Sequence, residues 1–151
     1  MLLLSGWVLL HLVLAAGLTV LARRYAMARQ LLDQPGERRS HRVATPRGGG
    51  ISIVVATLTA SIVLALYWPE HAPVLWCFAA GLVLVAAVGW LDDHRPLSPW
   101  LRLVVQAVAG AILGAGLYGS GETMLTAALA LVLVMVLVNV WNFMDGIDGL
   151  A

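Results

Sequence analysis

The sequence predicts an all-α, polytopic membrane protein with about five transmembrane helices and its N-terminus on the periplasmic side. Three observations lead to this fold class. The 151 residues are 61% hydrophobic and 11% charged, whereas soluble domains are about 25% charged. The apolar residues gather into runs long enough to cross the hydrocarbon core of a bilayer. All nine basic residues are arginines, and they occur in two short stretches.

Five apolar segments have the length of a membrane span, which is about 17–25 residues. Irregular backbone is too costly in lipid, so each segment is expected to be helical. Pro69 follows the second span, Pro96 ends the third, and Ser98-Pro99 supplies a capping hydroxyl and a first-turn proline for the fourth. The predicted spans cover residues 2–22, 51–68, 74–91, 101–118 and 123–141.

The arginines predict the orientation of the spans. Residues 23–50 contain seven arginines, and Arg95 and Arg102 follow the third span. The loops on the other side contain none. By the positive-inside rule, the loops at 23–50 and 92–100 are cytoplasmic. The six tryptophans lie near span ends, as in an aromatic belt. The net charge of +1 gives no indication of a nucleic-acid partner.

Two adjacent carboxylates, Asp92 and Asp93, end the third span. Neighbouring negative charges repel each other, and a hard cation such as Mg²⁺ relieves the repulsion because it prefers oxygen ligands. Carboxylates are also common where a span meets water, so the alternative is a solvated pair with Arg95 as counter-ion. The pair alone does not decide between a metal site and a solvated loop.

A second polar cluster follows the fifth span, where Asn139, Asn142, Asp145 and Asp148 recur at every third position. Residues three apart are neighbours on a helix, although a longer series drifts around it. A glycine after each aspartate indicates a break that would bring the series together. The alternative is a polar fringe leaving the membrane. Polar groups inside a span need partners, which favours a ligand site.

The first arginine-rich loop contains His41 and Arg47 and ends in Gly48-Gly49-Gly50. Arginines bind phosphate in a bidentate manner, and glycines let backbone amides approach an anion at a helix start. The alternative is a positive-inside loop that contacts acidic lipid headgroups. A single histidine in such a loop is more often a surface residue than a catalyst.

The fourth span contains Gly110 and Gly114 in a G-x-x-x-G pattern. This pattern predicts close helix packing within the chain, with formation of a homodimer as the second use. Gln106 in the same span is expected to form a hydrogen bond with a neighbouring helix. The single cysteine, Cys77, lies in an apolar run and excludes a disulfide framework.

Together the polar segments resemble the polyprenyl-phosphate N-acetylhexosamine-1-phosphate transferase family, which is glycosyltransferase family 4. The matching patterns are D-x-P-x-x-R-x-x-H at Asp33–His41, T-P-R-G-G-G at Thr45–Gly50, G-x-x-D-D at Gly89–Asp93 and N-x-x-N-F-x-D-G-I-D-G-L-A at Asn139–Ala151. The last pattern is long and specific. The resemblance extends over essentially the whole chain.

The resemblance implies a multi-pass enzyme of the bacterial inner membrane with its active site on the cytoplasmic face. Its partners would be UDP-N-acetylhexosamine, undecaprenyl phosphate and the lipid bilayer, and its cofactor Mg²⁺, or Mn²⁺ in its place. The lipid phosphate would attack the sugar-linked phosphorus and release UMP, which begins envelope polysaccharide synthesis. Arg47 to Gly50 stand where the peptidoglycan translocase usually has T-M-G-G, which favours O-antigen and related initiators.

The resemblance also implies a role for individual residues. Asp92 and Asp93 are the expected catalytic residues, and one of them is a candidate to take a proton from the lipid phosphate. The expected metal ligands are Asp92, Asp93, Asn142 and Asp145. The expected substrate contacts are His41, Arg47, Arg102, Asn139 and Asp148.

Family members have more spans than this sequence, with a further aspartate and a basic loop later in the chain. Residues 1–151 are therefore expected to be the N-terminal half of the family domain, with little or no activity by themselves. One alternative is a non-catalytic membrane scaffold or inactive fragment. The other is an intramembrane aspartyl protease, although the G-x-G-D pattern of that class is absent around Asp145 and Asp148.

Overall fold

The computed structural model describes residues 2–33, 44–46 and 48–144, which form five long helices and one pair of very short strands. Each helix is long and apolar enough to cross a membrane, so the predicted all-α membrane fold is confirmed. In chain order the elements are α1 (Leu2–Ala28), β1 (Leu32–Asp33), β2 (Thr45–Pro46), α2 (Gly50–Tyr67), α3 (Ala72–His94), α4 (Pro99–Gly119) and α5 (Met124–Met144).

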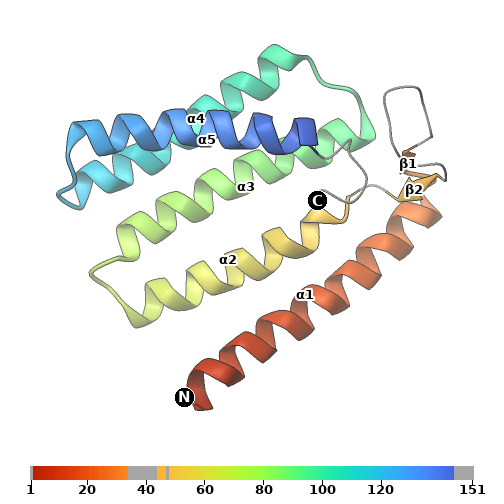
Figure 1. Cartoon of the computed structure of the whole chain (residues 1–151), viewed down its shortest axis with the longest axis horizontal. Coiled ribbons are helices and arrows are strands. Elements are labelled where there is room, and N and C mark those ends of the chain that lie inside the picture. The colour runs from red at the N-terminus through yellow and green to blue at the C-terminus, as the bar shows by residue number, and fades with distance from the viewer. Residues whose placement is uncertain (1, 34–43, 47, 145–151) are drawn as a thin grey trace.

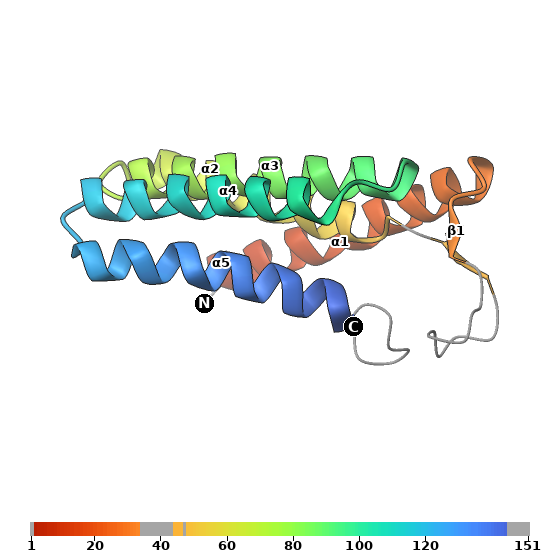
Figure 2. The same ribbon diagram turned by 90° about the horizontal axis from the view of Figure 1, so that it is seen from above.

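The helices pack in sequence order as successive antiparallel neighbours (Figure 1). Helices α2, α3 and α4 form one layer, while α5 packs on α4 outside that layer and α1 crosses obliquely beside α2 (Figure 2). This up-and-down order brings the end of α1, the start of α2, the α3–α4 turn and the end of α5 to one end of the molecule. We call it the arginine-bearing end, because it includes Arg29, Arg95 and Arg102.

Glycines on α4 allow α5 to approach closely. A Cβ atom added at Gly110 would lie 2.9 Å from Leu131 Cα, and one added at Gly114 would lie 2.7 Å from Ala127 O. No side chain fits such spaces without a shift of the backbone. The prediction that the G-x-x-x-G pattern serves packing within the chain is therefore confirmed.

The opposite side of α4 packs against α3 by the same principle. A Cβ atom at Gly116 would lie 2.7 Å from Cys77 Cβ, and one at Gly81 would lie 3.2 Å from Ala109 O. Helix association in lipid depends on close van der Waals contact, because there is no hydrophobic effect between helices there. Small residues on two sides of α4 make it the centre of the α3–α4–α5 packing.

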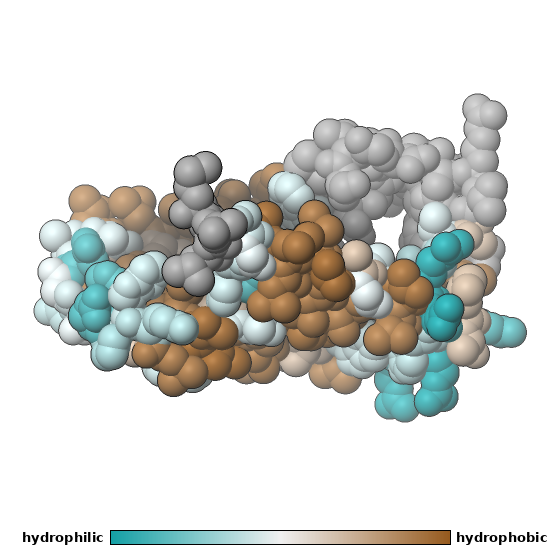
Figure 3. Space-filling model, turned by 90° about the horizontal axis from the view of Figure 1, so that it is seen from below, coloured by the Kyte–Doolittle hydropathy of each residue, from teal (hydrophilic) through white to brown (hydrophobic). Residues whose placement is uncertain are grey.

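Most large apolar side chains point outward, as expected for a protein with a lipid-facing surface. Figure 3 shows hydrophobic side chains across the middle of one face and hydrophilic ones toward both ends. The hydrophobic side chains on the outside of α1 and α5 include Leu12, Val20, Leu129, Val136 and Leu137, all more than 48% exposed. The buried polar groups on α2 are satisfied locally, as in Ser61, which donates to Thr57 O at 2.9 Å.

Three helices end clearly later than the sequence prediction, and one of them is α5, which continues to Met144 rather than ending at residue 141. Helix α1 continues to Ala28 rather than ending near residue 22, and α3 continues to His94. Asp92 and Asp93 therefore lie in the last turn of α3 and not in a loop that begins at residue 92. Hydropathy marks where a span leaves lipid, but a helix continues beyond that point as long as its backbone remains hydrogen-bonded.

The strand pair was not predicted. Leu32 pairs with Pro46 and Asp33 with Thr45 in antiparallel register, which closes the base of the α1–α2 connection. Two-residue strands have no alternating hydrophobic pattern, so the sequence contains no signal for them. The pairing places β2 next to α1, and α2 begins shortly after β2.

Candidate functional site

The adjacent carboxylates at the end of α3 face different neighbours. Successive residues on a helix are about 100° apart around its axis, since a turn takes about 3.6 residues. Asp92 consequently faces α4, whereas Asp93 faces the connection between α1 and α2. The sequence prediction treated the two as one metal-binding pair, but the structure gives each its own surroundings.

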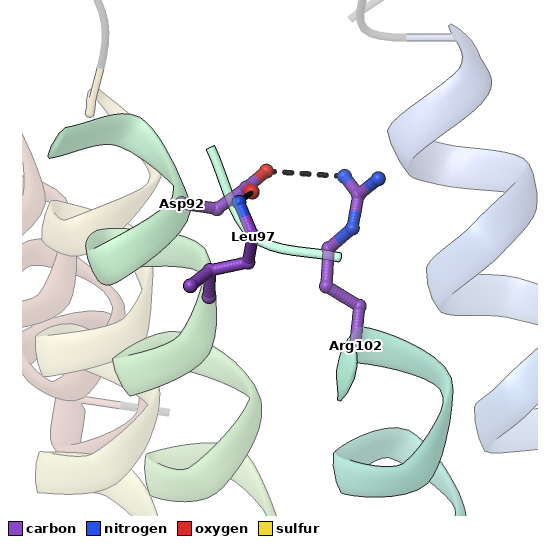
Figure 4. A network of polar contacts seen from close by, with 3 residues as sticks. All are labelled: Asp92, Leu97 and Arg102. Atoms are coloured by element: carbon purple, nitrogen blue, oxygen red, sulfur yellow. Dashed lines mark hydrogen bonds and ion pairs between the residues drawn. The ribbon is translucent and has the colours of Figure 1, made fainter. Parts of the chain in front are cut away.

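Asp92 joins the two sides of the α3–α4 turn (Figure 4). Its Oδ1 accepts a hydrogen bond from Leu97 N at 2.7 Å, and its Oδ2 accepts one from Arg102 Nη1 at 3.0 Å. The Asp92 side chain is 27% exposed and the Arg102 side chain 30%. Both oxygens of Asp92 thus accept hydrogen bonds from protein groups. Arg102, which was predicted to contact substrate, forms an ion pair with Asp92.

Asp93 lies against the glycine-rich end of the first connection. A Cβ atom built on Gly48 would be 3.9 Å from Asp93 Oδ2 and 3.9 Å from Trp90 Cζ3. Gly48 has a φ of 84°, in the left-handed region that favours glycine. The fold therefore brings together the T-P-R-G-G-G and G-x-x-D-D segments, which are some forty positions apart in the sequence.

Aromatic and cationic side chains connect α1 with α3 beside this contact. Tyr25 stacks on Trp90 with ring centroids 5.3 Å apart, and its hydroxyl lies 3.2 Å from His94 Nε2. Arg29 sits over the Tyr25 ring at 5.8 Å, a cation–π arrangement. No sequence pattern predicts this cluster. The only signal was the position of tryptophans near span ends, which predicts an aromatic belt but no specific partner.

Asn139, a predicted substrate contact on α5, is hydrogen-bonded to α4. Its Nδ2 donates to Gln106 Oε1 at 2.6 Å and to Met135 O at 2.8 Å. The prediction that Gln106 bonds a neighbouring helix is confirmed. Asn139 itself is exposed, so its side chain remains accessible while it makes these contacts.

Several predicted residues cannot be compared with the structure. His41, Arg47, Asp145 and Asp148 lie outside the described residues. Asn142 belongs to the last turn of α5, but its side chain is not among those described. The assignments for these five residues remain predictions from the family resemblance.

The donor chemistry at this end suits a hard cation. Carboxylate oxygens are the ligands that Mg²⁺ prefers. Within residues 2–33, 44–46 and 48–144, no three His, Cys, Asp or Glu side chains gather closely enough to hold a metal ion. The predicted set draws Asp145 from beyond this range. Asp93 fits such a site by its place beside the glycine-rich connection, while the carboxylate of Asp92 is directed to Leu97 N and Arg102.

These features define a multi-pass membrane protein whose polar site lies at one membrane face, where the end of α3 meets a glycine-rich connection. The chain belongs to glycosyl transferase family 4, whose sequence model matches residues 75–151. The matched region begins in α3 and contains Asp92, Asp93 and the whole second polar cluster.

Individual relatives agree with this family assignment. The chain is 34% identical over 142 residues to the undecaprenyl-phosphate alpha-N-acetylglucosaminyl 1-phosphate transferase of Yersinia pestis, a match that covers 85% of this chain and 38% of that protein. Its identity to the enzyme of the same name from Escherichia coli K12 is 32%, with the same coverage. A probable undecaprenyl-phosphate N-acetylglucosaminyl 1-phosphate transferase of Bacillus subtilis is 25% identical over 146 residues, which cover 89% of this chain and 40% of that protein.

The chain therefore spans about two fifths of the length of these relatives. No solved structure matches it.

Proposed function

We propose that this protein contributes the Asp92–Asp93 and Asn139–Ala151 segments to an enzyme that transfers N-acetylhexosamine-1-phosphate from UDP-N-acetylhexosamine to undecaprenyl phosphate. UMP is the second product, and the lipid-linked sugar begins synthesis of a cell-envelope polysaccharide. The family assignment and the names of the relatives support the reaction class. The observation that carries the proposal is the position of Asp93 beside Gly48, with Oδ2 3.9 Å from where a Cβ atom would stand on that glycine.

The reaction concentrates negative charge, because a phosphate attacks a diphosphate. Mg²⁺, or Mn²⁺ in its place, would supply positive charge at the diphosphate oxygens when bound. Asp93 would hold that cation with Asn142 and Asp145, or take the proton of the incoming lipid phosphate. The backbone beside Asp93 has glycines at residues 48–50, which allow close approach of a phosphate group.

Asp92 has a different part in this scheme. Its carboxylate holds Leu97 N and Arg102, so it fixes the end of α3 relative to the start of α4. We propose that Asp92 acts first by orienting Asp93 and by keeping Arg102 near the site. A change of partners when substrate binds would free one Asp92 oxygen for the cation, as the family resemblance implies.

The location of the site follows from chemistry and charge. UDP-sugars are cytoplasmic compounds, and the positive-inside rule places the arginine-bearing end on the cytoplasmic side. We therefore propose that the protein resides in the bacterial inner membrane with this end in the cytoplasm. His41, Arg47 and Asp148 are the proposed additional contacts to phosphate, sugar and nucleotide.

The test measures UMP release from UDP-N-acetylglucosamine in the presence of undecaprenyl phosphate. Membranes would contain the longest in-frame protein that includes residues 1–151, and a parallel sample would contain residues 1–151 alone. Asp93→Asn is expected to lower kcat by about 10²- to 10⁴-fold, the range for loss of a general base, with normal membrane insertion. Glu70→Gln, at the opposite end of the molecule, is the matched control. Chelation of divalent cations should abolish the reaction, and added Mg²⁺ or Mn²⁺ should restore it.

Two results would contradict the proposal. Normal turnover by Asp93→Asn would remove that carboxylate from the chemistry. Absence of UMP release from the longer wild-type protein would favour the alternative of a non-catalytic membrane scaffold. Activity of residues 1–151 alone would refute only the expectation that this part needs the remainder of the family's length.

A further inference from the structure

A buried amide on α4 holds an exposed amide on α5. Gln106 is 6% exposed, and its Oε1 accepts a hydrogen bond from Asn139 Nδ2 at 2.6 Å. The same nitrogen donates to Met135 O at 2.8 Å. A side-chain amide nitrogen carries two hydrogens. Both N–H groups of Asn139 therefore have acceptors within the chain.

These contacts fix which way the Asn139 amide points. The carbonyl oxygen of Met135 can only accept a hydrogen bond, so the nitrogen of Asn139 has to face it. Turning the amide over would place Oδ1 against that carbonyl and lose the bond to Met135 O, even if the Gln106 amide turned over with it. Asn139 consequently has one preferred orientation, in which Oδ1 is the atom that is left to act on a ligand, as a hydrogen-bond acceptor.

The pair is not needed to bring α4 and α5 together. Gly114 lies against Ala127, and Gly110 lies against Leu131, at distances that leave no room for a side chain. One more step of four residues along each helix places Gln106 opposite Met135, nearer the arginine-bearing end. An apolar side chain would continue this packing without the cost of a polar group in a span. An amide at that place is better explained by the orientation that it gives to Asn139.

We propose that Gln106 is a positioning residue of the transfer site. Buried inside the bundle, it holds the exposed Asn139 amide so that Oδ1 accepts a hydrogen bond from a hydroxyl or N–H group of the nucleotide-sugar. The inference rests on the proposed function, in which Asn139 contacts substrate. Gln106 acts only through Asn139 and does not touch the substrate itself.

The decisive variants change the acceptor but keep the shape of residue 106. Gln106→Met retains the length of the side chain and removes the acceptor, so the Asn139 amide keeps only its bond to Met135 O and is held less firmly. The KM for the UDP-sugar should rise about 10- to 100-fold, by analogy with the loss of a hydrogen bond that orients a metal ligand, with a smaller change in kcat. Gln106→Glu keeps an acceptor oxygen at the same reach and should restore most of the affinity.

Ser61→Ala is the control for loss of a buried polar group. Ser61 is 5% exposed and bonds only within α2 as far as the described contacts go, to Thr57 O. This variant should change thermal stability without changing the KM. A purely structural role of Gln106 would make Gln106→Met behave like Ser61→Ala, with a reduced active fraction and an unchanged KM, and would overturn the inference.

A second measurement examines the pair without turnover. Thermal unfolding of residues 1–151 in detergent micelles would be compared for Gln106→Met, Asn139→Leu and the double variant. The loss of Tm in the double variant should be smaller than the two single losses combined, because both single changes break the same bond. Additive losses would show that the bond is absent and would overturn the inference.

The outcomes separate this inference from the function on which it rests. A longer wild-type protein without UMP release would overturn the proposed function, and with it the assignment of Gln106 to a transfer site. The inference alone would be overturned by a different combination of results. In that case the wild type releases UMP and the Tm losses are coupled, but Gln106→Met has a normal KM.

Discussion

At the residue scale, the end of α3 shows how a helix separates two adjacent carboxylates. Asp92 bonds to Leu97 and Arg102, while Asp93 lies against Gly48. The angle of about 100° between successive helical residues is enough to direct them to different segments. Adjacent aspartates in a sequence suggest a shared cation. On this helix, however, Asp92 fixes the α3–α4 turn, while Asp93 lies beside the glycines where a phosphate group could approach.

Gly48 offers a test of the contact with Asp93. In Gly48→Ala the new Cβ atom has ordinary contacts at 3.9 Å, so the cost comes from the φ of 84°. We expect a destabilisation of about 1–2 kcal/mol or a shift of the connection away from Asp93, with lower transferase activity in either case. Thermal unfolding and UMP release would measure the two effects.

Gly49→Ala is the matched control for that experiment. Gly49 has a φ of −58°, and a Cβ atom there would meet nothing within 4 Å. This variant should retain wild-type stability. Equal behaviour of the two alanine variants would show that the left-handed backbone at Gly48 does not matter for the site.

At the element scale, the α3–α4 turn is held by side chains as well as by backbone. Ser98 caps α4 by accepting from Leu101 N at 3.2 Å, and Asp92 reaches across the turn to Leu97 N and Arg102. Serine at an N-cap followed by proline was predicted from the sequence. The role of Asp92 was not, because it depends on how α3 and α4 are oriented relative to each other.

The two partners of Asp92 should contribute unequally to stability. Arg102→Gln removes an ion pair between groups that are 27% and 30% exposed, so it should cost less than about 1 kcal/mol. High salt should reduce even this effect, because the pair is partly screened by solvent. Asp92→Ala also leaves Leu97 N without its acceptor and should cost more. Unfolding in detergent at low and high salt would measure both variants, and a larger loss for Arg102→Gln than for Asp92→Ala would contradict this account.

Helix α1 is attached to the remaining helices by polar and aromatic contacts near its C-terminal half. Thr19 Oγ1 donates to Ser52 Oγ at 2.8 Å, and Ser52, which is 1% exposed, donates to Gly49 O at 2.7 Å. Farther along α1, Tyr25 stacks on Trp90 of α3. These contacts give an otherwise lipid-facing helix a defined position beside the glycine-rich connection.

At the scale of the whole molecule, five antiparallel spans place every second connection at the same end. The α1–α2 connection, the α3–α4 turn and the end of α5 share the arginine-bearing end (Figure 1). Segments far apart in the sequence therefore meet there. A polar site at one membrane face is thus a direct result of the number and order of the spans.

The orientation of the molecule in the membrane can be tested by cysteine labelling. With Cys77→Ala as background, Ser98→Cys should react with a membrane-impermeant maleimide only in inside-out vesicles. Glu122→Cys at the opposite end should react only in right-side-out cells, because the positive-inside rule places the arginine-bearing end in the cytoplasm. The reverse pattern would contradict both the predicted orientation and the proposed cytoplasmic site.

Most of the fold was predictable, but only part of the site. The five spans and the packing role of Gly110 and Gly114 came from patterns confined to single segments, and the structure confirms them. The continuation of α3 through Asp93 was missed because hydropathy falls before the helix ends. The strand pair at Leu32 and Asp33 was missed because two residues have no periodicity.

The segments that cross the membrane, their order and the residues that provide charge at one end can all be predicted from the chain of amino acids. These properties follow from local hydropathy and from the alternation of the spans, so no tertiary information is needed. The packing of the helices is what places Asp93 beside Gly48, Asp92 against Arg102 and Gln106 against Asn139. Such contacts depend on how each helix is rotated about its axis and how it is displaced along its neighbour. Those quantities are set by close packing of side chains from two segments and are not encoded in either segment alone.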